Sequence, residues 1–225
     1  MTINEDSSLS CIEIEPTNPA NTSIIWLHGL GADGNDFVSV IPELNLPPTT
    51  TMRFIFPHAP IMPVTINNGY KMRAWYDIYA IAIDAKIDRN GINQSVRQLE
   101  KLIQREISRG IDTKNIFLAG FSQGAAIALT TGLCYPASLA GIIALSGYLP
   151  LANEVLQKAS VANRHTPIFL AHGTEDPIVP YTIGKMGYDI LRQAAYPVTW
   201  HSYTMLHSIC EAEINDISQW LQDRV

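Results

Sequence analysis

Short apolar runs and longer amphipathic stretches alternate through most of the chain. Apolar runs of strand length occupy residues 23–27, 52–56, 115–119, 140–145 and 167–171, and residues 198–203 form a later, more polar strand. Apolar side chains recur at helical spacing at Ile92, Val96, Leu99, Ile103 and Ile107, and again at Cys210, Ile214, Ile217 and Leu221. Strands that alternate with helices favour a parallel sheet, whose strands are buried on both faces. The pattern therefore predicts an α/β fold with a mostly parallel central sheet and helices on both faces.

Residues 57–90 interrupt this alternation and are the least regular part of the chain. Prolines and the turn-forming run Asn67-Asn68-Gly69 predict loops there, with a short hairpin. An irregular segment of this length in a compact domain is usually functional, often as a lid or a pocket wall. The sequence shows no internal repeat, low-complexity tract or linker, so we expect one domain over residues 1–225 with no separate cap domain.

Composition and charge narrow the class of protein. The chain has 225 residues, of which 47% are apolar and 16% charged, enough for one domain with a substantial core. A net charge of −6 argues against nucleic acid or an anionic membrane as the main partner. The N-terminus is polar and acidic, and no apolar run approaches the roughly 20 residues of a membrane span. The three cysteines are widely spaced, as in reduced cytosolic proteins. We therefore expect a cytoplasmic protein without stable membrane insertion.

The most informative motif is a G-x-S-x-G sequence, Gly120-Phe121-Ser122-Gln123-Gly124. It follows a buried-strand run and precedes the small-residue run 125–129, which predicts a helix. A G-x-S-x-G between a strand and a helix is typical of a nucleophile elbow, a tight turn that exposes the serine hydroxyl above a sheet. The strained backbone and the close approach of neighbouring chain require glycine around the serine. The motif therefore predicts Ser122 as a nucleophile.

A serine nucleophile needs a general base, and the base needs an orienting acid. In hydrolases with this elbow, the acid and then the histidine follow the serine along the chain. Four histidines follow Ser122, at His165, His172, His201 and His207. His165 lies in a polar stretch before a strand, His172 precedes the candidate acids, and His201 lies inside a strand. His207 follows that strand and precedes the last helix, so we predict His207 as the base.

The candidate acids are Glu175 and Asp176, which follow the predicted strand 167–171. Both carboxylates lie on the loop where an acid at the carboxyl end of a strand is expected. An aspartate before a proline is also an ordinary turn former. The residues alone therefore leave the choice between the two carboxylates open.

The tetrahedral intermediate of acyl transfer needs backbone N–H donors. One is expected from Gln123, directly after the nucleophile, at the start of a helix. The other is expected from the glycine-rich loop after the first apolar run, Trp26-Leu27-His28-Gly29-Leu30-Gly31, where we assign it to Leu30. His28 in this loop is better explained as a residue that orients the loop than as a catalytic one.

Together these motifs resemble the acyl-protein thioesterase and carboxylesterase family of α/β-hydrolases, the phospholipase/carboxylesterase group. The resemblance extends from about residue 23 to residue 222. It rests on Leu27-His28-Gly29-Leu30-Gly31, Pro57-His58-Ala59-Pro60, Trp75-Tyr76-Asp77-Ile78, Gly120-Phe121-Ser122-Gln123-Gly124, His172-Gly173, Asp176-Pro177-Ile178-Val179-Pro180 and His207-Ser208.

The resemblance implies a single-domain serine hydrolase that cleaves carboxylic esters or thioesters through an acyl-enzyme intermediate. It implies Ser122 as nucleophile, Asp176 as acid and His207 as base, with Leu30 and Gln123 as oxyanion donors. It also implies that no metal and no organic cofactor takes part. The expected substrate is an acyl ester or thioester of a small molecule, a lipid or an acylated protein, and the family permits a homodimer.

The acyl pocket is less well specified. Trp75 is a candidate for the pocket wall through the resemblance. Ile78 and Ile81, in the irregular segment, either line a groove for an acyl chain or pack within a hairpin, and the residues leave both interpretations open. Family members often carry a second glycine where this chain has Ala125, and we expect one extra methyl group there to be tolerated.

Two other functions compete with this one. A lysophospholipase, a peptidase or another acyl hydrolase would use the same residues on a different bond. A non-catalytic binding protein with this fold is expected to have lost the serine, the acid or the histidine, and all three are present. For a scaffold protein the sequence offers no supporting feature.

Overall fold

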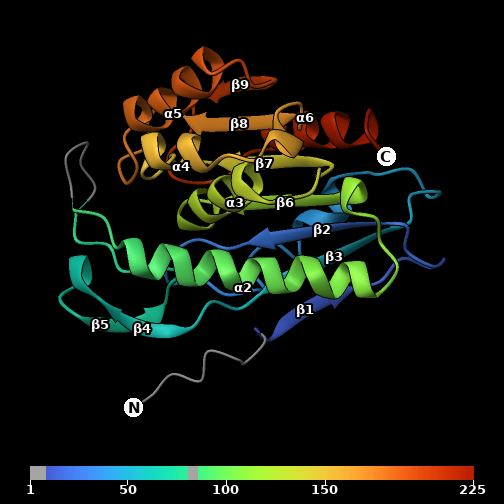
Figure 1. The fold of residues 1–225 in the computed structure, drawn as a ribbon, viewed down its shortest axis with the longest axis horizontal. Helices are drawn as coiled ribbons and strands as arrows, with labels where there is room; N and C mark the ends of the chain where they lie inside the picture. Colours follow the sequence, from blue (N-terminus) through green and yellow to red (C-terminus); the bar gives the residue numbers. More distant parts are fainter. Residues whose placement is uncertain (1–8, 81–85) are drawn as a thin grey trace.

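A computed structural model of the chain describes residues 9–80 and 86–225. The described part contains a seven-stranded sheet in the order β1-β3-β2-β6-β7-β8-β9, in which only β1 and β3 pair antiparallel (Figure 1). Its strands are β1 (Cys11–Ile14), β2 (Thr22–Leu27), β3 (Met52–Pro57), β6 (Ile116–Phe121), β7 (Gly141–Leu145), β8 (Ile168–Gly173) and β9 (Val198–Tyr203). The predicted α/β fold with a mostly parallel sheet is confirmed.

Helices cover both faces of the sheet, as expected (Figure 1). They are α1 (Val40–Glu43), α2 (Arg89–Ser108), α3 (Gln123–Cys134), α4 (Ala152–Lys158), α5 (Tyr181–Gln193) and α6 (Glu211–Gln222). Successive side chains along each strand point to opposite faces of the sheet, so the hydrophobic core has one part on each face. Ile25 and Leu27 of β2 pack on the face of α2 and α3, whereas Ile24 and Trp26 pack on the face of α1 and α6. Further along the sheet, α4 and α5 cover the same face as α3.

The helix that follows the elbow is buried around nearly its whole circumference. Every residue of α3 from Gln123 to Leu133 is buried against β6, β7 and the neighbouring helices. A run of alanines, glycines and threonines allows this, because small side chains let the helix lie close to the sheet. By contrast α2 is amphipathic, and the Asp88 side chain caps its start by accepting a hydrogen bond from the Gly91 N–H at 3.0 Å.

The irregular segment contains a hairpin that stands apart from the main sheet, at the lower left of Figure 1. Its antiparallel strands are β4 (Ile61–Val64) and β5 (Tyr70–Arg73), joined by a single 3₁₀ turn at Thr65–Asn67. Asn68 and Gly69 close the turn with positive φ angles of 55° and 74°. The Asp77 carboxylate fastens the turn by accepting hydrogen bonds from the backbone N–H and hydroxyl of Thr65. Ile81 lies outside the described residues.

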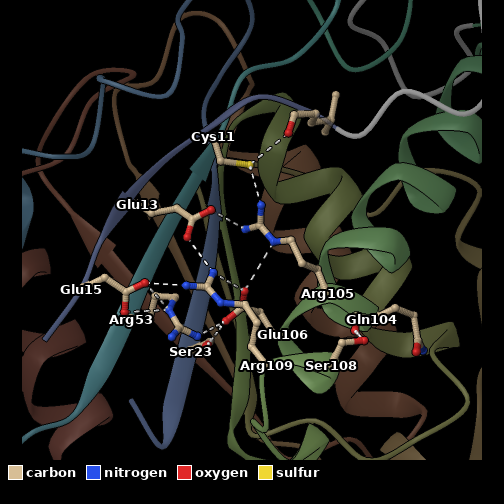
Figure 2. Close-up of polar contacts among 11 residues, drawn as sticks. Cys11, Glu13, Glu15, Ser23, Arg53, Gln104, Arg105, Glu106, Ser108 and Arg109 are labelled. Carbon is tan, nitrogen blue, oxygen red and sulfur yellow. Dashed lines mark hydrogen bonds and ion pairs between the residues drawn. The ribbon is translucent and has the colours of Figure 1, made fainter. Parts of the chain in front are cut away.

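The antiparallel strand β1, which the sequence pattern did not predict, is fastened by a buried network of charges (Figure 2). At its centre is Glu106 of α2, whose side chain is fully buried. Its carboxylate accepts hydrogen bonds from Arg53 at 2.6 Å, Ser23 at 2.7 Å and Arg109 at 3.1 Å. Toward the surface, Glu13 pairs with Arg105 of α2 and with Arg109, which follows the helix, and Glu15 pairs with Arg53 and Arg109. The network lies near the amino ends of β2 and β3, at the opposite edge of the sheet from the loops that follow β6, β8 and β9.

None of the helices in the described ranges is both long enough and apolar enough to cross a bilayer. The three cysteines, Cys11, Cys134 and Cys210, are free thiols. Burial raises the pKa of the Cys11 and Cys134 thiols above the ordinary value, which keeps them protonated and unreactive at neutral pH.

Candidate active site

Ser122 lies at a sharp turn between β6 and α3, with φ 54° and ψ −117°. The turn brings backbone segments so close together that side chains cannot fit. A Cβ on Gly120 would stand 2.4 Å from the backbone of Gly124, and a Cβ on Gly124 would stand 2.4 Å from the carbonyl oxygen of Leu27. The two glycines of the motif are therefore required by the geometry of the turn, which places Ser122 at the carboxyl edge of the sheet.

Ala125, where related proteins often have glycine, is buried in the first turn of α3. The space for its methyl group comes from Gly147, in the loop after β7. A Cβ on Gly147 would stand only 2.5 Å from the Cβ of Ala125. The extra methyl group is tolerated because the residue facing it has no side chain.

His207 and Asp176 approach each other from the loops after β9 and β8. The His207 Nδ1 lies 2.7 Å from the Asp176 Oδ2. Because an ionised carboxylate only accepts hydrogen bonds, the Nδ1 carries the proton and the Nε2 is left with a free lone pair. The imidazole is thus held in the tautomer that can accept a proton at its far nitrogen.

The Asp176 side chain is fully buried and held from several sides. Its Oδ1 accepts hydrogen bonds from the backbone N–H groups of Ile178 at 2.8 Å and Val179 at 2.9 Å. The Nε2 of His172 lies 3.3 Å from its Oδ2 and 2.9 Å from the carbonyl oxygen of Val179, so the Nε2–H points toward both. Burial lowers the pKa of His172, which keeps that ring neutral. The loop therefore presents one carboxylate oxygen to His207 in a fixed direction.

The structure separates the residues that the sequence had left as alternatives. Glu175 is exposed, whereas its neighbour Asp176 faces His207. His165 is exposed before β8, and His201 stacks on Phe169 at 4.3 Å within β9. Of the histidines that follow Ser122, His207 is thus the one that combines an acid partner with a place on a loop at the carboxyl edge.

Two contacts bring the other loops to the elbow. The ring of His207 packs on Phe121, the residue before Ser122, with ring centroids 4.8 Å apart. A Cβ on Gly29, in the loop after β2, would stand 3.5 Å from the Cβ of Ser122. The loops that follow β2 and β9 thus meet at the elbow, although they are widely separated in sequence.

The loop that carries Leu30 is held rigidly beside Ser122. Gly31, with φ 79°, donates its N–H to the carbonyl oxygen of Arg73 at 2.9 Å. The buried ring of His28 donates from Nδ1 to the Gly29 carbonyl at 2.6 Å and accepts at Nε2 from the Ala59 N–H at 3.1 Å. Burial lowers the pKa of His28 to about 4, so the ring stays neutral and keeps both bonds at neutral pH. His28 therefore orients the loop, as expected.

A cavity of about 250 Å³ is separate from these loops, and neither Leu30 nor Ser122, Asp176 or His207 lines it. Its walls come from residues 76–80 and 86–88, from residues 148–152 after β7, and from one side of α5. Ile78 and Leu149 contribute apolar surface, and Gly187 of α5 opens space that a side chain would fill. At one wall the hydroxyl groups of Tyr76 and Tyr148 lie 2.8 Å apart.

Trp75 is buried beside the elbow. Its indole Nε1–H donates to the carbonyl oxygen of His28 at 2.9 Å.

The sequence did not indicate the cavity walls from α5 and from residues 148–152. The one available signal was Gly187, inside a helical pattern, since glycine is unfavourable inside a helix unless space is needed.

The sequence profile of the Phospholipase/Carboxylesterase family matches residues 10–224. Among curated proteins, the acyl-protein thioesterase 1 of Yarrowia lipolytica is 39% identical, with 93% of this chain and 95% of that protein covered. The acyl-protein thioesterase 1 of Neurospora crassa is 41% identical, with 90% of this chain and 86% of that protein covered.

Solved structures agree with these relationships. The crystal structure of Arabidopsis thaliana SOBER1 superposes with a TM-score of 0.86 at 32% identity, over 91% of this chain and 99% of that chain. The crystal structure of Zea mays acyl-protein thioesterase 2 superposes with a TM-score of 0.85 at 29% identity, over 96% and 98% of the two chains.

Proposed function

Since this chain belongs to the phospholipase/carboxylesterase family of α/β-hydrolases, and is therefore a hydrolase of acyl esters or thioesters, we propose that Ser122, His207 and Asp176 are its catalytic triad. The observation that supports this most directly is the 2.7 Å contact between His207 Nδ1 and Asp176 Oδ2, on loops at the same sheet edge as the elbow. The contact supports Asp176 over Glu175 as the acid and His207 over the other histidines as the base.

In this mechanism the Nε2 of His207 takes the proton of Ser122 as the Oγ attacks the acyl carbonyl carbon. The tetrahedral intermediate collapses when His207 gives that proton to the departing alcohol or thiol, and the acyl group remains on Ser122. Water then attacks the acyl-enzyme, with His207 again as base, and the free acid leaves. Asp176 orients the imidazole and stabilises its protonated form throughout.

The oxyanion of each tetrahedral intermediate is proposed to accept hydrogen bonds from the backbone N–H groups of Leu30 and Gln123. Gln123 is the first residue of α3, so its N–H points out of the helix N-terminus, where negative charge is favoured. Leu30 lies in the loop whose Gly29 faces Ser122. Both donors thus border the place where the carbonyl oxygen of an attacked ester would lie.

We further propose that the cavity lined by Ile78, Leu149 and Gly187 receives the acyl chain. Its walls are largely apolar, and Tyr76 at one wall is bonded directly to the Gln123 side chain. The substrate is proposed to be an acylated protein, because the curated relatives are named acyl-protein thioesterases.

The test is hydrolysis of p-nitrophenyl esters from acetate to palmitate, and of a palmitoyl thioester peptide, by the wild type and by Ser122→Ala. The variant is expected to lose at least about 10⁴-fold in kcat on every substrate. Ser218→Ala is a matched control, since Ser218 is a buried serine of α6 that donates to the Leu44 carbonyl. Equal hydrolysis by Ser122→Ala and the wild type would refute the proposed nucleophile.

The rate should also fall on the acid side of neutrality, because a protonated imidazole cannot accept the Ser122 proton. Measurement of kcat/KM between pH 5 and pH 8 checks this. A flat profile would contradict the role of His207.

A further inference from the structure

The segment Ala74–Tyr76 lies between the two loops that supply the proposed oxyanion donors. It follows the hairpin strand β5 and is buried throughout. The hydroxyl of Ser95 on α2 donates to the Trp75 carbonyl, and the Ala74 N–H donates to the Pro60 carbonyl at 3.0 Å. The segment is therefore fixed to the body of the protein independently of the elbow.

On one side this segment is bonded to the side chain of Gln123. The Gln123 Oε1 accepts a hydrogen bond from the Trp75 N–H at 2.8 Å, and its Nε2 donates to the Tyr76 carbonyl at 2.7 Å. Both bonds are buried, where water cannot replace them. Gln123 thus has two separate functions in this arrangement, since its backbone N–H is a proposed oxyanion donor while its side chain fixes where that N–H lies.

On the other side the segment is bonded to the loop that carries Leu30. The Trp75 indole donates to the His28 carbonyl at 2.9 Å, and the two rings pack at 5.3 Å. Just before the segment, the Arg73 carbonyl accepts the Gly31 N–H at 2.9 Å. Leu30 therefore lies between two residues that are both fastened to the stretch 73–75.

We propose that Trp75 is a positioning residue that sets the spacing between the two oxyanion donors, the backbone N–H groups of Leu30 and Gln123. Its backbone N–H anchors one donor through the Gln123 side chain, and its indole anchors the other through His28. The proposal rests on the proposed function. It differs from a pocket-wall role for Trp75, which would act on the acyl chain and not on the oxyanion.

The two roles predict different kinetics for Trp75→Phe, which removes the indole N–H and keeps an aromatic ring. Misplacement of an oxyanion donor weakens only the transition state, so kcat should fall at least about tenfold while KM stays within about twofold. The loss should be the same for acetate and palmitate esters. A loss that grows with chain length, or an unchanged kcat, would overturn the proposal.

Trp26→Phe is the matched control. Trp26 is an equally buried tryptophan on β2, and its indole nitrogen has no hydrogen-bond partner among the described residues. Both substitutions replace a buried indole by a phenyl ring. Only Trp75→Phe also removes a hydrogen bond to the loop that carries Leu30. Trp26→Phe should keep kcat within about twofold of the wild type.

A second variant, Gln123→Met, removes the two hydrogen bonds that the Gln123 side chain makes to Trp75 and Tyr76. It should likewise lower kcat and leave KM nearly unchanged. A trifluoromethyl ketone forms a tetrahedral adduct with an oxyanion and so reports on the two donors. For Trp75→Phe and Gln123→Met, its Ki should rise by the factor by which kcat/KM falls. A reduced kcat with unchanged inhibitor affinity would contradict the proposal.

Wild type and Ser122→Ala in the same assays separate this proposal from the proposed function. If wild-type hydrolysis depends on Ser122 and Trp75→Phe retains full kcat, only the positioning role is wrong. If Ser122→Ala hydrolyses the esters as fast as the wild type, the proposed triad is wrong and the role of Trp75 falls with it.

Discussion

His207 and Asp176 are 31 residues apart in the chain and 2.7 Å apart at their side chains. The loops that carry them follow the adjacent parallel strands β9 and β8, whose carboxyl ends meet at one edge of the sheet. The strand order thus places the two residues side by side. The buried bonds from Ile178 and Val179 then fix the direction in which the carboxylate points.

Asp176→Asn should reduce kcat by roughly 10³- to 10⁴-fold. The backbone N–H groups of Ile178 and Val179 require the amide oxygen on their side, so the amide NH2 faces His207 and the proton can no longer lie on Nδ1. Steady-state kinetics on a p-nitrophenyl ester give the factor. Glu175→Gln is the control, since the neighbouring carboxylate is exposed and should be dispensable. If the two variants exchanged their effects, Glu175 would be the acid.

Glu106→Gln should lower the free energy of unfolding by about 3–5 kcal/mol, because it leaves the guanidinium groups of Arg53 and Arg109 without their buried counter-charge. Denaturant unfolding measures the change. Glu154→Gln breaks the exposed ion pair with Arg89 and should cost less than about 1 kcal/mol. Equal effects would mean that the buried network adds little to stability. Catalysis by folded Glu106→Gln should be unchanged, since the network lies at the far edge of the sheet.

Glu213, in the first turn of α6, is fully buried, and the backbone of Cys210 favours its charged form less than the burial disfavours it. Burial raises its pKa to about 8, with a smaller contribution from the Asp216 carboxylate. The folded protein therefore holds a proton that the unfolded chain releases near pH 4.5, so stability is lost as pH rises from about 4.5 to 8.

Glu213→Gln removes this titration. Relative to the wild type, the variant should gain stability by about 4 kcal/mol between pH 5 and pH 8, since one pKa unit corresponds to about 1.4 kcal/mol. Denaturant unfolding of both proteins at the two pH values checks the difference, in which the other titrating groups cancel. An equal response of both proteins to pH would show that Glu213 titrates normally.

Gly187→Val should shorten the preferred acyl chain. A Cβ at this position would stand 3.4 Å from the Leu149 N and 3.5 Å from its Cβ, so the larger side chain fits only by filling the cavity. We expect kcat/KM for the palmitate ester to fall at least about tenfold, because one misplaced methylene group alone changes binding by about 1–3 kcal/mol. The acetate ester is the internal control and should be unaffected. A uniform loss along the series would place the acyl chain elsewhere.

The sequence predicted most reliably what depends on local sterics and on order along the chain. Gly120 is required by contacts within a few residues of Ser122, whereas Gly124 is required by the carbonyl oxygen of Leu27, on the neighbouring strand β2. The G-x-S-x-G motif records both requirements, so the elbow could be predicted from it. The order of strands and loops led to His207 as the base and left Glu175 and Asp176 as candidate acids, between which the family resemblance chose Asp176. Their catalytic roles are a proposal.

What could not be predicted depends on contacts across the fold. The β1 strand has only four residues, and besides its pairing with β3 it is held by an ion pair between Glu13 and Arg109, 96 residues away at the end of α2. Nothing in the sequence around Trp75 shows that its indole bonds to the His28 carbonyl, since that contact joins segments 47 residues apart. One wall of the cavity likewise comes from α5. This helix is about 100 residues from Ile78 in the chain, so the sequence does not show that the two line the same cavity.

Ala125 and Gly147 share a space that holds a single methyl group. In a protein with glycine at the position of Ala125, the closest obstacle to a small side chain at the position of Gly147 is absent, and the Ser122 carbonyl oxygen, 3.0 Å from such a Cβ, has to shift only slightly. The two positions should therefore change together in evolution, with the methyl group passing from the helix to the facing loop and back. A substitution that is excluded at the position of Gly147 while Ala125 is present becomes less costly once that methyl group is lost, so the history of the elbow includes a residue from the loop after β7.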